Sequence, residues 1–304
     1  MPSYFLVLIA PKGHGALLER LAAGIGARPE APDVRFSVPV WLSEGEAVEV
    51  AFEAPDPAGA AGVRSLLSDV VGSHPVDVCV VAAAHRRKRL LVADMDSTII
   101  EQECIDEMAD ALGLKPKIAA ITERAMRGEL DFEAALRERL GLLAGLGEDA
   151  LDKVWRERLT VMPGARALVA TMRAHGAYAA LVSGGFTYFT SRVAGLVGFD
   201  ENRANTLEVV DGRLTGSVVG PVLGREAKLA TLEQLTAANG LDAAETLAVG
   251  DGANDLAMIR KAGLGVAYRA KPVVAAEAGA AITHGDLTAL LYLQGYRADE
   301  IVRD

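Results

Sequence analysis

Four aspartates stand in two short clusters, each directly after an apolar run of the chain. The first cluster, Asp-Met-Asp-Ser-Thr, contains Asp94 and Asp96. The second, Gly-Asp-Gly-Ala-Asn-Asp, contains Asp251 and Asp255. Alone, the first cluster is typical of a solvated turn, and the second is an Asx turn capping the next helix or a ligand site. Four carboxylates buried together, however, would repel one another unless a cation neutralised them. Oxygen ligands on short loops suit Mg²⁺, so the sequence offers a candidate magnesium site.

Three further polar features could hold a phosphate next to that cation. Ser183-Gly184-Gly185 follows another apolar run, and we predict a strand-to-helix turn there with a hydroxyl and free backbone amides. Lys228 lies at the start of a predicted helix, where a lysine is ordinarily solvated surface, and Asn254 belongs to the second aspartate cluster. The five histidines are scattered, which leaves no ligand set for a softer metal.

Short apolar runs predict the strands that carry these groups. The runs are Leu90–Ala93, Ala177–Val182, Thr246–Val249 and Leu264–Ala267. Wholly apolar strands alternating with helical stretches predict an α/β fold with a doubly wound parallel sheet. Ligands bind at the carboxyl ends of such strands, so the aspartates and Ser183 are expected to meet at one edge of the sheet.

The interval between the first two strands is predicted to be helical. From about residue 105 to 162, apolar residues recur at helical spacing with charges between them. A helical insertion between two strands of one sheet predicts a cap over the sheet edge.

Residues 1–85 predict a separate α+β domain. The expected elements are strand Tyr4–Ala10, helix His14–Ala27, strand Val34–Val40, strand Ala47–Phe52, helix Ala58–Val71 and strand Val76–Ala83. This order, βαββαβ, is that of a ferredoxin-like fold. The basic run at 85–89 is interpreted as a solvated linker, with phosphate attraction as the alternative, and residues 90–304 form the second domain.

Composition narrows the class of protein. The 304 residues carry 31 basic and 41 acidic side chains, and the resulting charge of −10 argues against nucleic acid as a partner. The apolar start lacks a basic leader, and no apolar run reaches the roughly 18 residues of a membrane span. Two cysteines without a CxxC pair favour a reducing compartment, so we expect a cytoplasmic protein with a small-molecule substrate.

The ordered set Asp-x-Asp, Ser, Lys, Gly-Asp-x-x-x-Asp resembles the haloacid dehalogenase-like superfamily from about Leu90 onward. Within it, the phosphoserine phosphatase family is the most similar, through Glu103-Cys-Ile-Asp106 and the predicted cap segment 122–139. The resemblance implies Mg²⁺-dependent hydrolysis of O-phospho-L-serine to L-serine and phosphate, the last step of serine biosynthesis. The alternatives are another small phosphomonoester, such as phosphohomoserine or a sugar phosphate, and a catalytically silent binding protein.

The resemblance also implies catalytic roles. Asp94 is the expected nucleophile, forming an aspartyl-phosphate, and Asp96 the acid that protonates the leaving oxygen and later deprotonates water. Mg²⁺ would be held by Asp94, Asp251 and the backbone carbonyl of Asp96. Asp255 would orient either a metal-bound water or Lys228.

Substrate binding is implied in two parts. Ser183, Gly184 and Lys228 would hold the phosphoryl oxygens, with Asn254 hydrogen-bonding in the same pocket. Glu103 would receive the ammonium of phosphoserine, and Arg139 would grip its carboxylate. Met126 and Phe132 are candidates for an apolar wall, with core packing of the cap as the alternative for both.

The N-terminal domain resembles ACT-type amino-acid-binding modules in the order of its elements. Its segment Pro11-Lys-Gly-His-Gly15 departs from the aspartate-containing turn of effector-binding examples. Two roles therefore stay open for it, binding of an effector and formation of a homodimer.

Overall fold

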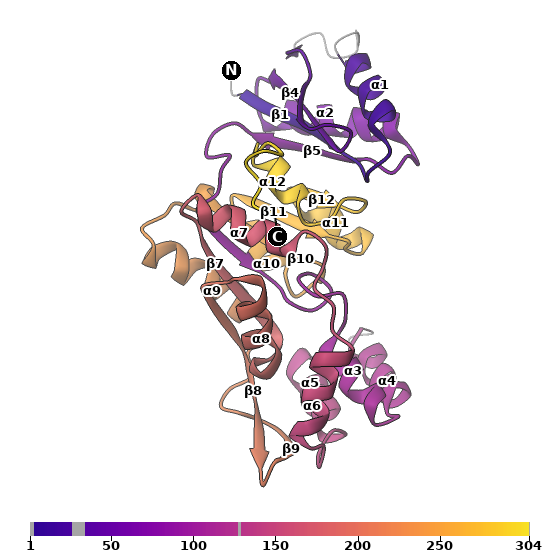
Figure 1. The fold of residues 1–304 in the computed structure, drawn as a ribbon, viewed down its shortest axis with the longest axis vertical. Helices are drawn as coiled ribbons and strands as arrows, with labels where there is room; N and C mark the ends of the chain where they lie inside the picture. Colours follow the sequence, from indigo (N-terminus) through magenta and orange to yellow (C-terminus); the bar gives the residue numbers. More distant parts are fainter. Residues whose placement is uncertain (1–2, 26–33, 127–128, 304) are drawn as a thin grey trace.

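The computed structural model describes residues 3–25, 34–126 and 129–303, which form two sheets and a helical insertion (Figure 1). The first sheet and its helices comprise β1 (Ser3–Ile9), α1 (Gly15–Ile25), β2 (Arg35–Phe36), β3 (Val40–Ser43), β4 (Ala47–Glu53), α2 (Pro57–Val71) and β5 (Asp77–Ala82). The strand order is β2-β4-β1-β5, with β3 also pairing β4, and every pair is antiparallel. This is the predicted βαββαβ order except that the second strand is in two pieces; the end of the predicted first helix, Gly26 and Ala27, lies outside the described residues.

One predicted strand of this sheet is divided in two. The prediction of a single strand over Val34–Val40 is wrong, because β2 ends at Phe36 and β3 begins at Val40. Pro39 lies between them, and a proline has no N–H to donate to the ladder.

The second sheet has seven strands in the order β12-β11-β10-β6-β7-β8-β9. Its strands are β6 (Leu90–Ala93), β7 (Tyr178–Phe186), β8 (Glu201–Val210), β9 (Arg213–Val219), β10 (Thr246–Gly250), β11 (Leu264–Tyr268) and β12 (Ala280–Ile282). All neighbours pair in parallel except β8 and β9. The predicted parallel α/β sheet is confirmed.

Helices cover both faces of this sheet because its central strands are apolar on both sides. The helices are α7 (Ala165–Ala174), α8 (Thr187–Val197), α9 (Arg225–Ala238), the 3-10 turn η1 (Ala243–Glu245), α10 (Leu256–Lys261), α11 (Pro272–Glu277) and α12 (Ala289–Leu293). Leu90 and Val92 of β6 belong to the core cluster that contains Leu232 of α9, whereas Leu91 belongs to the cluster with Leu168 of α7. Alternate residues of one strand thus serve opposite faces.

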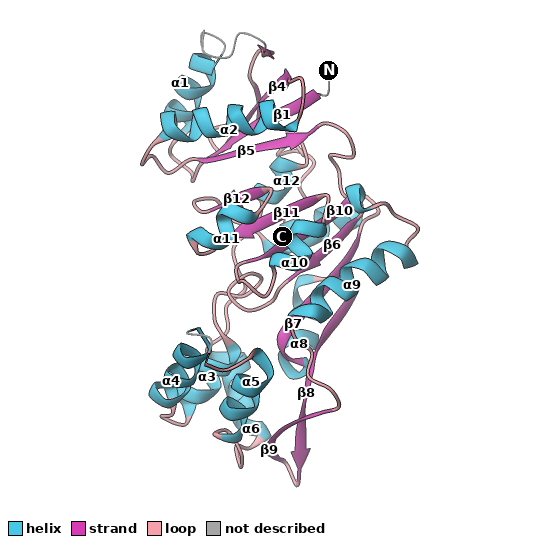
Figure 2. Cartoon of the chain, turned by 180° about the vertical axis from the view of Figure 1, so that it is seen from behind, coloured by secondary structure: helices cyan, strands magenta, loops and turns pink. Residues whose placement is uncertain are grey.

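The predicted cap is helical. It consists of α3 (Cys104–Ala111), α4 (Lys115–Met126), α5 (Phe132–Gly141) and α6 (Glu148–Glu157), called the helical insertion below. Figures 1 and 2 show it at the end of the molecule opposite the first sheet, with the β8–β9 hairpin running alongside. The hairpin was not predicted, although Asp211-Gly212 between two apolar segments is a typical two-residue hairpin turn.

The two sheets meet where β5 runs beside β12. The buried carboxylate of Asp77, on β5, accepts hydrogen bonds from the backbone N–H groups of Thr283, His284 and Gly285 at 2.8 to 3.2 Å. Because each of these amides belongs to the loop after β12, the first sheet is fastened to the second by a carboxylate in a nest of amides.

The basic run between the sheets is more than a solvated linker. Arg86 donates to Glu49 at 2.6 Å and to the carbonyl of Leu293 at 2.9 Å, and its guanidinium lies 3.9 Å from the ring centre of Phe5. The Lys88 side chain is buried, with Nζ 2.7 Å from the carbonyl oxygen of Ala244. The interpretation as a solvated linker is therefore wrong for these two residues, which pack at the junction.

Among the described residues, none of the helices combines the length and apolar character needed to cross a membrane. Cys79 and Cys104 are both buried and unpaired.

Candidate active site

Lys228 and two aspartates form a buried charged centre beneath the carboxyl edge of the second sheet. Lys228 lies in the first turn of α9 and is 1% exposed, and its Nζ donates to Asp94 at 2.7 Å and to Asp255 at 2.6 Å. Burial alone would lower the pKa of Lys228, but the two carboxylates outweigh burial and raise it, so the ammonium stays charged. The surface lysine of the sequence pattern is in fact part of the core.

Asp255 is a hydrogen-bond partner of Lys228. Its Oδ1 accepts from Lys228, and its Oδ2 accepts from the backbone N–H of Gly252 at 3.0 Å. Each oxygen therefore has one hydrogen-bond donor within the protein. Of the two predicted roles for Asp255, orientation of Lys228 is the one with an observed contact.

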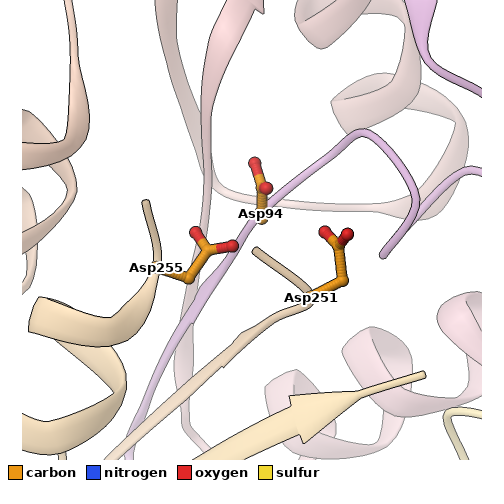
Figure 3. A group of neighbouring side chains, drawn as sticks. All are labelled: Asp94, Asp251 and Asp255. Carbon is orange, nitrogen blue, oxygen red and sulfur yellow. The ribbon is translucent and has the colours of Figure 1, made fainter. Parts of the chain in front are cut away.

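Asp94, Asp251 and Asp255 each offer an oxygen within 4.8 Å of the others (Figure 3). Burial and the Asp255 carboxylate raise the pKa of Asp94 well above its usual value, and the same two causes raise that of Asp251 to about 6. These shifts arise because one lysine does not balance the buried negative charge. The donor set of hard oxygens with uncompensated charge fits a divalent cation such as Mg²⁺.

Asp96 and Glu103 line the side of the site that faces the helical insertion. Burial, followed by the nearby Glu103 carboxylate, raises the pKa of Asp96 to about 7. Glu103 precedes α3 and accepts a hydrogen bond from Ser97 Oγ at 2.6 Å, and burial raises its pKa as well. Ser97 adopts a left-handed backbone, with φ of 55°, that aims its hydroxyl at Glu103. Such strain in a non-glycine residue is concentrated at functional sites.

The Ser183-Gly184-Gly185 segment continues a strand. The predicted strand-to-helix turn is wrong, because β7 extends to Phe186 and α8 begins at Thr187. The pairing of β7 with β8 changes register between Val182 and Phe186, so the ladder is interrupted at Ser183 and the two glycines. Ser183 is buried, and its Oγ accepts from the Gly185 N–H at 2.8 Å.

The helical insertion supplies the opposite wall. Arg139 and Phe132 both lie on α5, and Arg139 is held in place by a 3.2 Å hydrogen bond from Nε to the carbonyl of Ala135. Together with the sheet edge they enclose a cavity of about 130 Å³. It is lined by Asp94, Asp96, Glu103, Ile105, Phe132, Leu136, Arg139, Ser183, Gly184, Gly185, Phe186, Asp251 and Asn254.

Apart from Met126, the predicted site residues lie in or next to one cavity. Lys228 and Asp255 do not line it; Lys228 contacts Asp94, and Asp255 contacts Lys228. Phe132 lines it as expected, whereas the side chain of Met126 lies outside the described residues. Sequence reasoning missed Asn205, which contacts the Ser183 segment, and Thr98, whose hydroxyl donates to Asp251 at 3.2 Å. Thr98 stands in the first aspartate cluster and could have been found there; Asn205 stands in no recognisable motif.

The fold and the charged centre define a class of enzyme. A family model of haloacid dehalogenase-like hydrolases matches residues 91–260, more than half of the chain. The chain belongs to this family.

Similar proteins within that family are phosphoserine phosphatases. One from Streptomyces coelicolor is 46% identical over 241 residues, covering 79% of this chain and 58% of that protein. The chain spans less than two thirds of the length of the first curated relatives that it matches.

Solved structures agree on the fold. A probable phosphoserine phosphatase from Vibrio cholerae superposes with a TM-score of 0.74 at 33% identity, over 98% of this chain and 88% of that one. A substrate-bound phosphoserine phosphatase complex superposes with a TM-score of 0.63 at 39% identity, over 68% of this chain and 98% of that one.

Proposed function

We propose that this protein hydrolyses O-phospho-L-serine to L-serine and inorganic phosphate through an aspartyl-phosphate. The observation that carries the proposal is the Lys228 ammonium bridging Asp94 and Asp255 at 2.7 and 2.6 Å, with Asp251 beside them. Phosphoryl transfer depends mainly on positioning and on neutralising charge, and this centre supplies both. The phosphoserine phosphatases that the chain resembles support the choice of substrate.

Asp94 is the nucleophile in this proposal. Its Oδ1 accepts from Lys228 and from the backbone N–H of Met95, and these two contacts hold the carboxylate in place for attack on phosphorus. The bond from phosphorus to the seryl oxygen breaks as the bond to Asp94 forms. Lys228 opposes the rise in the pKa of Asp94 and draws off charge from the phosphoryl group.

Asp96 moves the protons. It protonates the departing seryl oxygen, then takes a proton from the water that attacks the aspartyl-phosphate and releases phosphate. Both directions of transfer are efficient when the pKa of the group lies near the working pH, and burial with Glu103 nearby raises that of Asp96 to about 7.

Mg²⁺ would be held by Asp94, Asp251 and the backbone carbonyl of Asp96. When bound, it supplies neutralising charge for the phosphoryl oxygens. Asp255 orients Lys228 by accepting its hydrogen bond, and Thr98 orients Asp251 by donating one to it.

Two residues that line the cavity recognise the amino-acid part of the substrate. Glu103 pairs with the ammonium of the substrate, and the hydrogen bond from Ser97 holds the Glu103 carboxylate in place. Arg139 pairs with the substrate carboxylate. Ser183, Gly184 and Asn254 bind the phosphoryl oxygens.

We infer a domain over residues 1–85, a phosphatase core over 90–304 and a cap at about 105–162. The strand order of the first sheet and its element order, βαββαβ with the second strand in two pieces, support an ACT-like domain, serving as an effector site or a homodimer contact. A cytoplasmic location, supported by two unpaired cysteines, completes this proposal.

Phosphate release from L-phosphoserine with and without Mg²⁺ tests the function. We expect turnover that is lost with chelator and restored by Mg²⁺. Phosphohomoserine, a sugar phosphate and phosphoethanolamine form the comparison panel. A higher kcat/KM for one of these would reassign the substrate, and no phosphate release from any of them would overturn the phosphatase.

A further inference from the structure

Asn205 connects the end of β7 with the segment that leads into α9, without lining the cavity. It lies on β8 and is 3% exposed, yet nothing in its sequence context marks it. Its side-chain Nδ2 donates to the carbonyl of Gly184 at 2.9 Å and to that of Leu223 at 3.2 Å. Its Oδ1 accepts from the Leu223 N–H at 2.7 Å. All of these contacts go to the backbone of two segments that carry proposed phosphate ligands.

The first contact fixes one peptide unit. The Gly184 carbonyl and the Gly185 N–H belong to the same planar trans peptide and point in opposite directions. Asn205 holds the carbonyl, so the N–H is aimed the other way, where it donates to Ser183 Oγ at the cavity wall. This occurs where the β7–β8 ladder is interrupted, so the side chain replaces a missing backbone partner.

The hydrogen bonds between Asn205 and Leu223 fix the segment that leads into the helix of Lys228. Asn205 satisfies both the N–H and the carbonyl of Leu223, in the manner of a neighbouring strand. Leu223 immediately precedes Gly224, which caps α9, and Lys228 lies one turn further on. The same amide therefore sets the Gly184–Gly185 peptide and the start of α9 relative to each other.

The ring of Phe132 depends on both segments. A Cβ at Gly184 would lie 2.9 Å from the Phe132 ring, and one at Gly224 would lie 3.4 Å from it. The Phe132 ring thus packs against two glycines, one from each of the two segments that Asn205 connects.

We propose that Asn205 is a positioning residue for phosphoryl transfer, which sets the Ser183-Gly184-Gly185 segment and the Lys228 ammonium relative to each other around the phosphoryl group. The inference rests on the proposed function, because it assigns the phosphoryl group to this cavity. An alternative role as a satisfied core amide would affect stability alone.

The test compares Asn205→Ala and the smaller change Asn205→Ser with Asn202→Ala, on purified full-length protein. Asn202 lies on the same strand, and its side chain accepts from Thr190 of α8 at 2.7 Å, away from the cavity. For Asn205→Ala we expect kcat on L-phosphoserine to fall about 100-fold, as misplacement by about 1 Å can cause. KM should change much less, and Asn205→Ser, whose hydroxyl can donate and accept one hydrogen bond in place of the amide, should lose less than the alanine variant.

The melting temperature separates positioning from folding. The proposal is supported if Asn202→Ala keeps its kcat although its melting temperature falls as far as that of an Asn205 variant. It is overturned if both Asn205 variants keep kcat within about threefold. It is also overturned if kcat falls together with the melting temperature in the Asn202 variant just as it does in the Asn205 variants. Absence of turnover in the unmodified protein would instead refute the proposed function, so the two failures are distinguishable.

Discussion

Lys228 shows why the charged residues of this site must be considered as a unit. An ammonium that is 1% exposed would ordinarily lose its proton or destabilise the fold. Here two carboxylates within 2.7 Å keep it charged, and the lysine in turn keeps Asp94 closer to its ionised form. Removing Lys228 would leave two buried carboxylates without a counter-charge.

Asp94→Asn is expected to abolish turnover while the protein still folds. The amide has nearly the volume of the carboxylate but cannot form an acyl-phosphate, and loss of a nucleophile costs many decades in rate. Steady-state phosphate release and circular dichroism provide the measurements. Retention of more than about a tenth of the rate would rule out the aspartyl-phosphate mechanism.

Arg139→Ala is expected to lower kcat/KM for phosphoserine about 10- to 150-fold, because a charge-assisted hydrogen bond contributes roughly 1.5–3 kcal/mol. Phosphoethanolamine, which lacks the carboxylate, should be affected far less. Arg137→Ala is the matched control, since Arg137 lies on the same helix and pairs with Glu133 on the exposed side. Equal losses on the two substrates would remove Arg139 from recognition of the carboxylate.

The helical insertion and the β8–β9 hairpin are joined by backbone hydrogen bonds. Leu214 of β9 donates to the carbonyl of Leu146 at 2.8 Å, and its own carbonyl accepts from Gly145 at 2.8 Å. Gly216 packs against the end of α5, where an added Cβ would lie 3.1 Å from Leu140 O. Because β8 also carries Asn205, one hairpin contacts both the insertion and the phosphate-binding segments.

Gly216→Ala is expected to lower the free energy of unfolding more than Gly220→Ala does. Both glycines have left-handed backbones, with φ of 87° and 77°, so alanine is strained at each by about 1–3 kcal/mol. Only Gly216 has neighbours within 4 Å of the added Cβ. Urea denaturation of the two variants gives the difference, and equal losses would show that the contact with α5 contributes nothing.

At the scale of the whole molecule, the first sheet is held to the second by polar groups that are largely buried. Asp77 accepts from a nest of amides, Arg86 pairs with Glu49, and Lys88 lies beneath the junction. Burial lowers the pKa of Lys88 to about 8, because its ammonium meets only a carbonyl and a more distant carboxylate. The junction therefore contains a charge that is unfavourable at neutral pH.

Lys88→Met is expected to alter how stability depends on pH. In the unfolded chain Lys88 titrates near 10.5 and in the folded chain near 8, so between these values the unfolded state binds more protons. The free energy of unfolding of the unmodified protein should then rise with pH relative to the variant, by up to about 3 kcal/mol. Urea denaturation from pH 7 to 10.5 measures it. Lys153→Met, at an exposed site, is the control, and identical pH profiles for all three proteins would disprove the burial effect.

The sequence by itself determined the parallel sheet and the members of the site. Wholly apolar runs identify β6, β10 and β11 because strands covered on both faces must be apolar on both sides. The aspartates and Ser183 could be grouped because parallel strands end at a common edge. The family motifs added Lys228, Glu103 and Arg139, none of which stands out by type or spacing.

Only the tertiary structure decided how those groups are connected. Whether Asp255 faces a water or Lys228, and whether Ser183 ends a strand or continues it, depends on contacts between segments far apart in the chain. Asn205 is the clearest case, since its partners lie 18 and 21 residues away along the chain. Local spacing determines which backbone groups need a partner, but packing determines which side chain reaches them.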